Sequence, residues 1–109
     1  NHAFVSGPAY WIYYGADGKP DTVFTLDIAV PIQGFFHSKK FSIKHLAPFK
    51  AVVHRHEGSW ELLGSSYGQI MHFVESNRIP IRDECRELYL NIDFERPENN
   101  ITEVQVGTV

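Results

Sequence analysis

The pattern of apolar and polar positions is clearest over residues 49–109, where it predicts a strand, a helix and two further strands in succession. Ser59 is a suitable helix N-cap, and Asn77 tolerates the left-handed conformation that ends many helices. Because Pro80 follows closely, we predict a helix over residues 59–77. Apolar side chains at spacings of three and four share one face of this helix: Trp60, Leu63, Tyr67, Ile70, Met71 and Val74.

The segments that flank this helix have the period-two alternation of strands. A strand over 51–53 precedes the helix, and a strand over 86–92 follows it. The turn-forming stretch 96–100 then reverses the chain into a strand over 102–106, which completes a β-α-β-β unit. The two faces of the middle strand carry Leu88, Leu90 and Ile92 on one side and Glu87, Tyr89 and Asn91 on the other.

The first half of the chain predicts a β-hairpin. An aromatic run favours a strand over 9–14, residues 17–21 suit a turn, and a second strand follows over 22–28. Residues 31–38 have the composition of a loop and include the Phe35-Phe36 pair, after which alternation resumes over 41–45.

The two halves resemble each other weakly. Residues 11–14 are similar to 87–90, and residues 27–32 are similar to 104–109. The likeness fits a duplication, and it also fits coincidence between two ordinary hairpins. If the chain is duplicated, the first half lacks the strand and helix that precede the hairpin in the second half. The start at Asn1 without Met agrees with an expectation that a longer protein was shortened here.

Length and charge narrow the class of protein. The 109 residues, 43% of them hydrophobic, fit one domain with its own core. A net charge of −3, with no basic run longer than Lys39-Lys40, predicts no nucleic-acid contact by this chain. The single Cys85 cannot form an internal disulfide, and no apolar stretch is long enough to span a bilayer, so we expect no membrane partner and a reducing cytoplasm.

Signals for metal binding or nucleophilic catalysis are weak. His54 and His56 share one side of a predicted strand, a spacing that can seat a metal, but no Cys or carboxylate motif accompanies them. Cys85 has no assigned base, and no serine lies in a nucleophile-elbow pattern. We therefore assign no metal ligand, no cofactor and no catalytic residue.

A family resemblance rests on His56, Gly58 and Trp60 at the helix entry, followed by Glu87 and Tyr89 on the next strand. In this order and spacing, they resemble the gyrase-inhibitor-like (GyrI-like) small-molecule-binding domains. Such domains serve as effector-binding modules of bacterial multidrug-responsive transcription activators. Trp60 departs from the pattern, because Tyr is usual there.

The resemblance implies an α+β fold in which two duplicated β-α-β-β units form a concave antiparallel sheet with two helices. Residues 1–109 are then a single domain, with a partial first unit over 1–47 and a complete second unit over 48–109. The first strand and first helix of the first unit are missing from this sequence.

The resemblance also implies a pocket between the two halves, lined by aromatic rings and a buried carboxylate that attracts cationic or amphipathic ligands. Its predicted ligand-binding residues are Glu87, Tyr89, Trp60, Tyr67, Trp11 and Tyr13. From the residues alone, Glu87 could equally be a solvated strand residue paired with Arg86 or Arg82, and the tyrosines could be simple packing residues.

Three functions fit this interpretation. The first is a small-molecule-binding domain that senses effectors for a transcription regulator. The second is a small-molecule hydrolase in which Glu87 acts with Tyr89 or Tyr67 in proton transfer. The third is a protein-interaction module of the gyrase-inhibitor type. The sheet face near Trp11 and Tyr13 is expected to lack a cover or to borrow one from a second copy, which predicts a homodimer.

Overall fold

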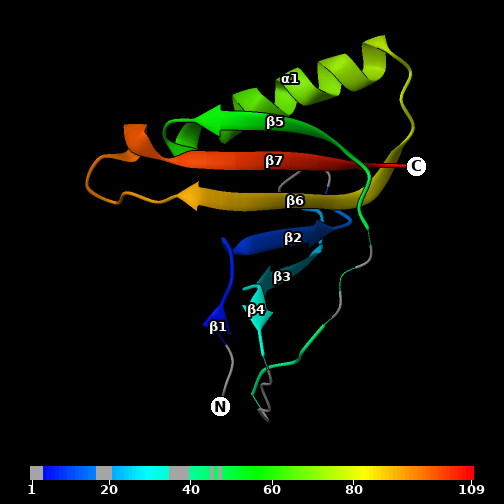
Figure 1. The fold of residues 1–109 in the computed structure, drawn as a ribbon. Coiled ribbons are helices and arrows are strands. Elements are labelled where there is room, and N and C mark those ends of the chain that lie inside the picture. The colour runs from blue at the N-terminus through cyan, green and yellow to red at the C-terminus, as the bar shows by residue number, and fades with distance from the viewer. Residues whose placement is uncertain (1–3, 17–20, 35–39, 45, 47) are drawn as a thin grey trace.

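The computed structural model describes residues 4–16, 21–34, 40–44, 46 and 48–109. Figure 1 shows its elements, which are β1 (Phe4–Val5), β2 (Tyr10–Tyr14), β3 (Thr25–Ala29), β4 (Ile32–Gln33), β5 (Ala51–Glu57), the 3-10 helix η1 (Trp60–Leu62), α1 (Leu63–Ser76), β6 (Ile81–Asn91), the 3-10 helix η2 (Pro97–Asn99) and β7 (Ile101–Thr108). Within this described part of the chain, no helix is both long and apolar enough to cross a membrane.

One antiparallel sheet organises the molecule, with the strand order β3-β2-β6-β7-β5. The segment β5-α1-β6-β7 is the predicted β-α-β-β unit, and the predicted hairpin β2-β3 joins it along β6 (Figure 1). Strands β1 and β4 pair separately as a small two-stranded sheet. The predicted α+β class is thereby confirmed, while the duplication of units stays a prediction.

The core lies between α1 and the side of the sheet that we call the helix face. Ile70 and Val74 of α1 pack with Val104 and Val106 of β7, and Val104 is 0% exposed. These helix positions belong to the stripe that the three-and-four spacing predicts. Since α1 contacts β5 and β7, it covers one end of the helix face.

The helix ends are set by local hydrogen bonds. Ser59 accepts a hydrogen bond at its Oγ from the backbone N–H of Glu61 (3.3 Å), which confirms the predicted N-cap. At the other end, Asn77 has φ −103 and its Nδ2 donates to the carbonyl of Phe73 (2.8 Å). The left-handed residue is Arg78 (φ 53), so placing that conformation at Asn77 was wrong by one position.

Strand β6 begins at Ile81, five residues before the predicted start. Its register against β7 shifts between Ile81 and Cys85 and again between Tyr89 and Asn91. Such irregularities interrupt the period-two pattern, so alternation alone missed the first part of the strand.

The first half differs from its prediction in detail. Strand β3 begins at Thr25 rather than at residue 22, and the predicted loop over 31–38 contains β4. The described residues 40–44 form no strand, contrary to the alternation there. The turn residues 17–20, the pair Phe35-Phe36 and His45 lie outside the described residues.

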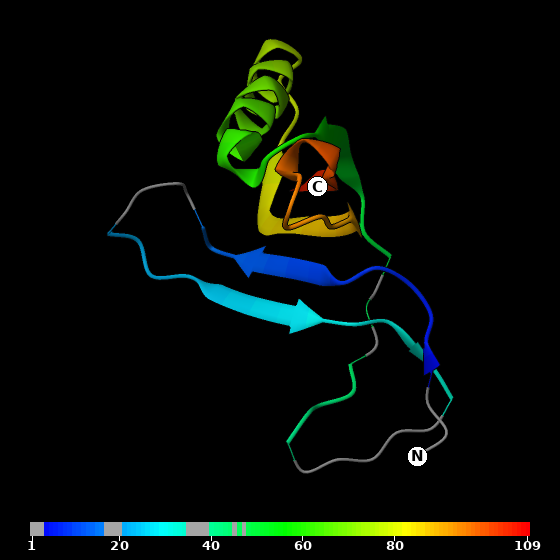
Figure 2. The same ribbon diagram turned by 90° about the vertical axis from the view of Figure 1, so that its left-hand side faces the viewer.

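Strands β2 and β3 extend the helix face beyond the end that α1 covers (Figure 2). Trp11 of β2 is the cross-strand partner of Glu87 on one side and of Ile28 on the other, so these three side chains share the helix face. Ile28 is 63% exposed. Part of the helix face is therefore open beside the buried core.

The connection from β4 to β5 contacts the opposite face of the sheet. Lys44 forms an ion pair with Asp27 of β3 (3.0 Å). The Arg86 guanidinium lies 3.8 Å from the centroid of the Phe49 ring and forms an ion pair with Glu84 (2.6 Å). These contacts lie on the face of the sheet opposite to α1.

Candidate functional site

Glu87 lies in the middle of the sheet and is 5% exposed. Its partners on the neighbouring strands are Trp11 of β2 and Val104 of β7, so its side chain points to the helix face. A buried carboxylate needs hydrogen-bond donors for its oxygens, because removing an ionised group from water costs roughly several kcal/mol.

Two phenols supply these donors. The Tyr67 hydroxyl, which comes from α1, donates to Glu87 Oε2, and the Tyr89 hydroxyl donates to Glu87 Oε1 at 2.5 Å. Each carboxylate oxygen therefore accepts a hydrogen bond, Oε2 from a residue of α1 and Oε1 from a residue of β6 itself. The alternative of a solvated Glu87 paired with Arg86 or Arg82 is wrong, since Glu87 is 5% exposed and Arg86 points to the opposite face and binds Glu84.

The environment keeps these phenols protonated. Burial raises the pKa of Tyr67 and of Tyr89, and the hydrogen bond to Glu87 and its negative charge raise both further. Burial, followed by the charge of Glu87, raises the pKa of Tyr13 to about 12. Burial and the same charge also raise the pKa of the Cys85 thiol, which disfavours the nucleophilic thiolate.

Aromatic rings surround Tyr89. Its ring makes edge-to-face contacts with Trp11 (centroids 5.6 Å apart) and with Trp60 (5.5 Å). The Trp60 indole N–H donates to Thr102 Oγ1 at 3.1 Å, and Thr102 is 0% exposed. This bond fixes the indole at the end of the helix face.

All six predicted ligand-binding residues meet in one group. We call it the Glu87 cluster, and it consists of Glu87, Tyr67, Tyr89, Trp11, Trp60 and Tyr13. Tyr13 belongs to it through its cross-strand pairing with Cys85 and its electrostatic interaction with Glu87. Two neighbours of Trp60 were not predicted from the sequence: Thr102, whose place in the alternation of the last strand was the only signal, and Phe94, an aromatic residue just before a turn.

The helix entry explains the spacing of His56, Gly58 and Trp60. The His56 Nε2–H donates to the carbonyl of Ser59 (2.8 Å), because a carbonyl can only accept. His56 Nδ1 forms a second hydrogen bond, with the Ser66 hydroxyl (2.7 Å). Gly58 has φ 121, a conformation that favours glycine. The motif therefore forms the corner between β5 and α1, and this corner orients Trp60.

Metal binding at this corner has no structural support. Both ring nitrogens of His56 are engaged, and His54 lies beside it on the same face of β5. Over the described ranges, no group of His, Cys, Asp and Glu side chains is arranged to hold a metal ion.

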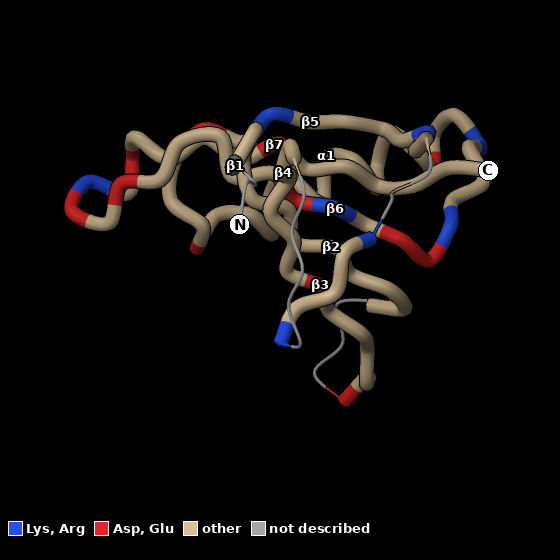
Figure 3. Tube along the Cα trace, turned by 60° about the horizontal axis from the view of Figure 1, so that its bottom comes forward, with Lys and Arg blue, Asp and Glu red and all other residues tan. Residues whose placement is uncertain are grey.

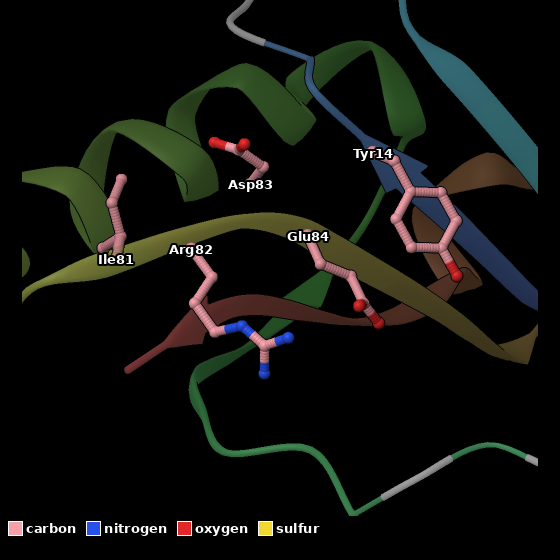
Figure 4. Close-up of a pocket in the computed structure, with 5 residues that line it drawn as sticks. All are labelled: Tyr14, Ile81, Arg82, Asp83 and Glu84. Atoms are coloured by element: carbon pink, nitrogen blue, oxygen red, sulfur yellow. The ribbon is translucent and has the colours of Figure 1, made fainter.

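Two open hollows lie outside the Glu87 cluster. One, of about 420 Å³, is lined by Tyr14 and residues 81–84, and Figure 4 shows Arg82 and Glu84 pointing to one side of β6 while Asp83 points to the other. The other, of about 280 Å³, lies between β5 and α1. Neither hollow is lined by a residue of the Glu87 cluster.

An antiparallel sheet with a helix over one end and a phenol-bound carboxylate beside it defines an α+β domain suited to holding small molecules. The sequence matches the GyrI-like small molecule binding domain over residues 1–107, and the chain belongs to this family. The predicted resemblance is thereby confirmed, and small-molecule binding is the function that the family indicates. No curated protein matches the chain.

Proposed function

We propose that the Glu87 cluster is the ligand site of this domain and that it binds amphipathic organic cations. The observation that carries the proposal is a carboxylate that is 5% exposed and accepts hydrogen bonds from two neutral phenols. These bonds orient the charge without neutralising it. In poorly hydrated surroundings, a cation beside this charge gains more Coulomb energy than it would in water.

The rings around Glu87 suit the same class of ligand. Trp11, Tyr89 and Trp60 form a continuous row, and an aromatic face attracts a cation electrostatically while its area attracts apolar groups. Trp11 also borders the open part of the helix face, which supports an approach from that side.

Binding fits the site better than hydrolysis does. A general base must lie within hydrogen-bond reach of the proton that it abstracts, and a general acid must give up its proton readily at the working pH. The phenols of Tyr67 and Tyr89 take one acceptor position on each oxygen of Glu87, and the raised pKa values of both phenols make them poor acids at neutral pH.

We further propose that ligand binding here controls a bacterial transcription regulator in the cytoplasm, and that another part of the protein contacts DNA. The net charge of −3 supports a role for this domain in ligand binding and not in DNA contact. In the described part of the chain, Lys and Arg occur on several elements instead of gathering on one (Figure 3). A second copy of the chain is proposed as a partner.

Titration with a planar cationic acridine dye tests the ligand site. We expect Glu87→Gln to weaken binding about tenfold or more, because it removes the buried charge and keeps the shape of the side chain. The matched control is Glu103→Gln on β7, which removes the same charge from the opposite face, where the cross-strand partner of Glu103 is Leu88. Equal affinity of the wild type and Glu87→Gln would remove Glu87 from the site.

A further inference from the structure

The row of rings continues past the predicted site to Phe94. The Phe94 ring contacts Trp60 edge to face, with centroids 5.9 Å apart. Phe94 lies in the loop between β6 and η2, at the end of the sheet where η1 begins (Figure 1). It is 82% exposed, whereas Trp60 is half-buried. The last ring of the row thus projects into solvent.

The loop holds Phe94 in this place. On one side of Phe94, the Asp93 N–H donates to Asn100 Oδ1 (2.6 Å), and Asn100 is 3% exposed. On the other side, the N–H groups of Glu95 (3.0 Å) and Arg96 (2.9 Å) donate to Asp93 Oδ1. Both chain neighbours of Phe94 are therefore fixed by hydrogen bonds, which hold the backbone of the loop in place.

Folding does not explain this arrangement. A Phe side chain contributes to stability in proportion to the apolar area that it buries, and Phe94 buries little. A ring that contacts Trp60 and is otherwise surrounded by solvent leaves most of its apolar area open to a ligand. The contacts from Glu87 through Tyr89 and Trp60 lead from a buried charge to an exposed apolar surface.

We propose that Phe94 is a specificity-determining residue which binds the apolar tail of an elongated amphipathic cation whose charged head lies at Glu87. This inference rests on the proposed function of the Glu87 cluster and adds the direction in which the ligand lies, with its charged head at Glu87 and its apolar tail at Phe94. The head approaches the carboxylate near Trp11 and Tyr89. The tail runs over Trp60 and covers Phe94, which removes the exposed ring from water.

Two dyes with one charged ring system test the orientation: N-methyl and N-nonyl acridine orange differ only in the length of the apolar tail. Against the wild-type protein, the nonyl dye should bind more tightly than the methyl dye. Phe94→Ala should weaken the nonyl dye about fivefold and leave the methyl dye within about twofold, because only the tail reaches residue 94. The matched control is Phe73→Ala, which removes a 51% exposed Phe ring from α1 and should leave both affinities unchanged.

The controls separate this inference from the proposal on which it rests. If Glu87→Gln weakens both dyes while Phe94→Ala weakens neither, the role of Phe94 is overturned and the Glu87 site stands. If Glu87→Gln weakens neither dye, the proposed function fails. Equal weakening of both dyes by Phe94→Ala would also overturn the proposed orientation. Should Phe94→Ala disturb the loop, as judged by its urea unfolding midpoint, Phe94→Ser removes the ring with a residue that suits turns and is measured in the same way.

Discussion

At the scale of single residues, the role of Glu87 depends on the hydrogen bonds that its two carboxylate oxygens accept from Tyr67 and Tyr89. Alternation correctly predicts that Glu87 and Tyr89 share a face. It does not reveal that this is the face under α1, because the opposite set of Leu88, Leu90 and Ile92 looks more apolar. In the structure Leu88 is buried, but Leu90 and Ile92 are 46% and 47% exposed. The contact from Tyr67 to Glu87 joins two elements 20 residues apart, which no local pattern encodes.

Tyr13 reports the charge of Glu87 in the absence of ligand. Its pKa is raised from 10.0 to about 12, first by burial and then by the carboxylate. The folded state therefore favours the protonated phenol, and the resulting stabilisation is complete below pH 10 and is lost as the pH rises towards 12. In Glu87→Gln the second cause disappears, so we expect the pKa of Tyr13 to fall.

The measurement is the absorbance of phenolate as a function of pH, with Tyr13→Phe in each background to identify the titration of this residue. The wild-type difference curve should have its midpoint near the raised pKa, and the Glu87→Gln curve should lie at lower pH. Superimposable difference curves would mean that burial alone shifts Tyr13 and that the charge of Glu87 is not felt there.

At the scale of elements, the corner between β5 and α1 positions Trp60 and was the best predicted part of the chain. The Ser59 N-cap, the apolar stripe and the strand before them follow from spacing and capping chemistry. The hydrogen bonds of His56 do not follow from these rules, because they depend on how closely the first turn of α1 approaches β5. Likewise, the first part of β6 escaped prediction where its register is irregular.

Ser66→Ala tests how far this corner depends on His56. Ser66 is 3% exposed, and its hydroxyl is the partner of His56 Nδ1. Removing it leaves a buried ring nitrogen without a hydrogen bond, which should lower the free energy of unfolding by about 1–3 kcal/mol. Urea unfolding followed by circular dichroism gives this value.

The neighbouring residue provides the control for Ser66. Ser65 is exposed on the same turn of α1, so Ser65→Ala should change the free energy of unfolding by no more than about 0.5 kcal/mol. If the two alanine variants are equally stable, the bond between Ser66 and His56 contributes nothing measurable. The geometry of the corner would then rest on Gly58 and the Ser59 cap.

At the scale of the whole molecule, the helix face has a covered half and an open half. The covered half was predictable, since the apolar stripe of α1 needs a sheet to pack on. The open half was expected from the absence of a second helical pattern in the first half of the sequence. The open part of the helix face includes Ile28 of β3, an edge strand that pairs only with β2 among the described strands.

We predict that two copies of the chain form a dimer through the open half of the helix face. An edge strand with an exposed apolar side chain, such as Ile28 at 63% exposure, is a ready site for pairing with a second copy. Sedimentation at increasing protein concentration should show a dimer in the wild type, and Ile28→Glu should shift the mass to the monomer because it would bury an unpaired charge in the contact. Val53→Glu is the control, since Val53 is 51% exposed on the other edge strand, β5, and on the opposite face. A wild-type protein that stays monomeric throughout, or equal dissociation by both substitutions, would contradict an interface at β3. The open face would then be left to the ligand alone.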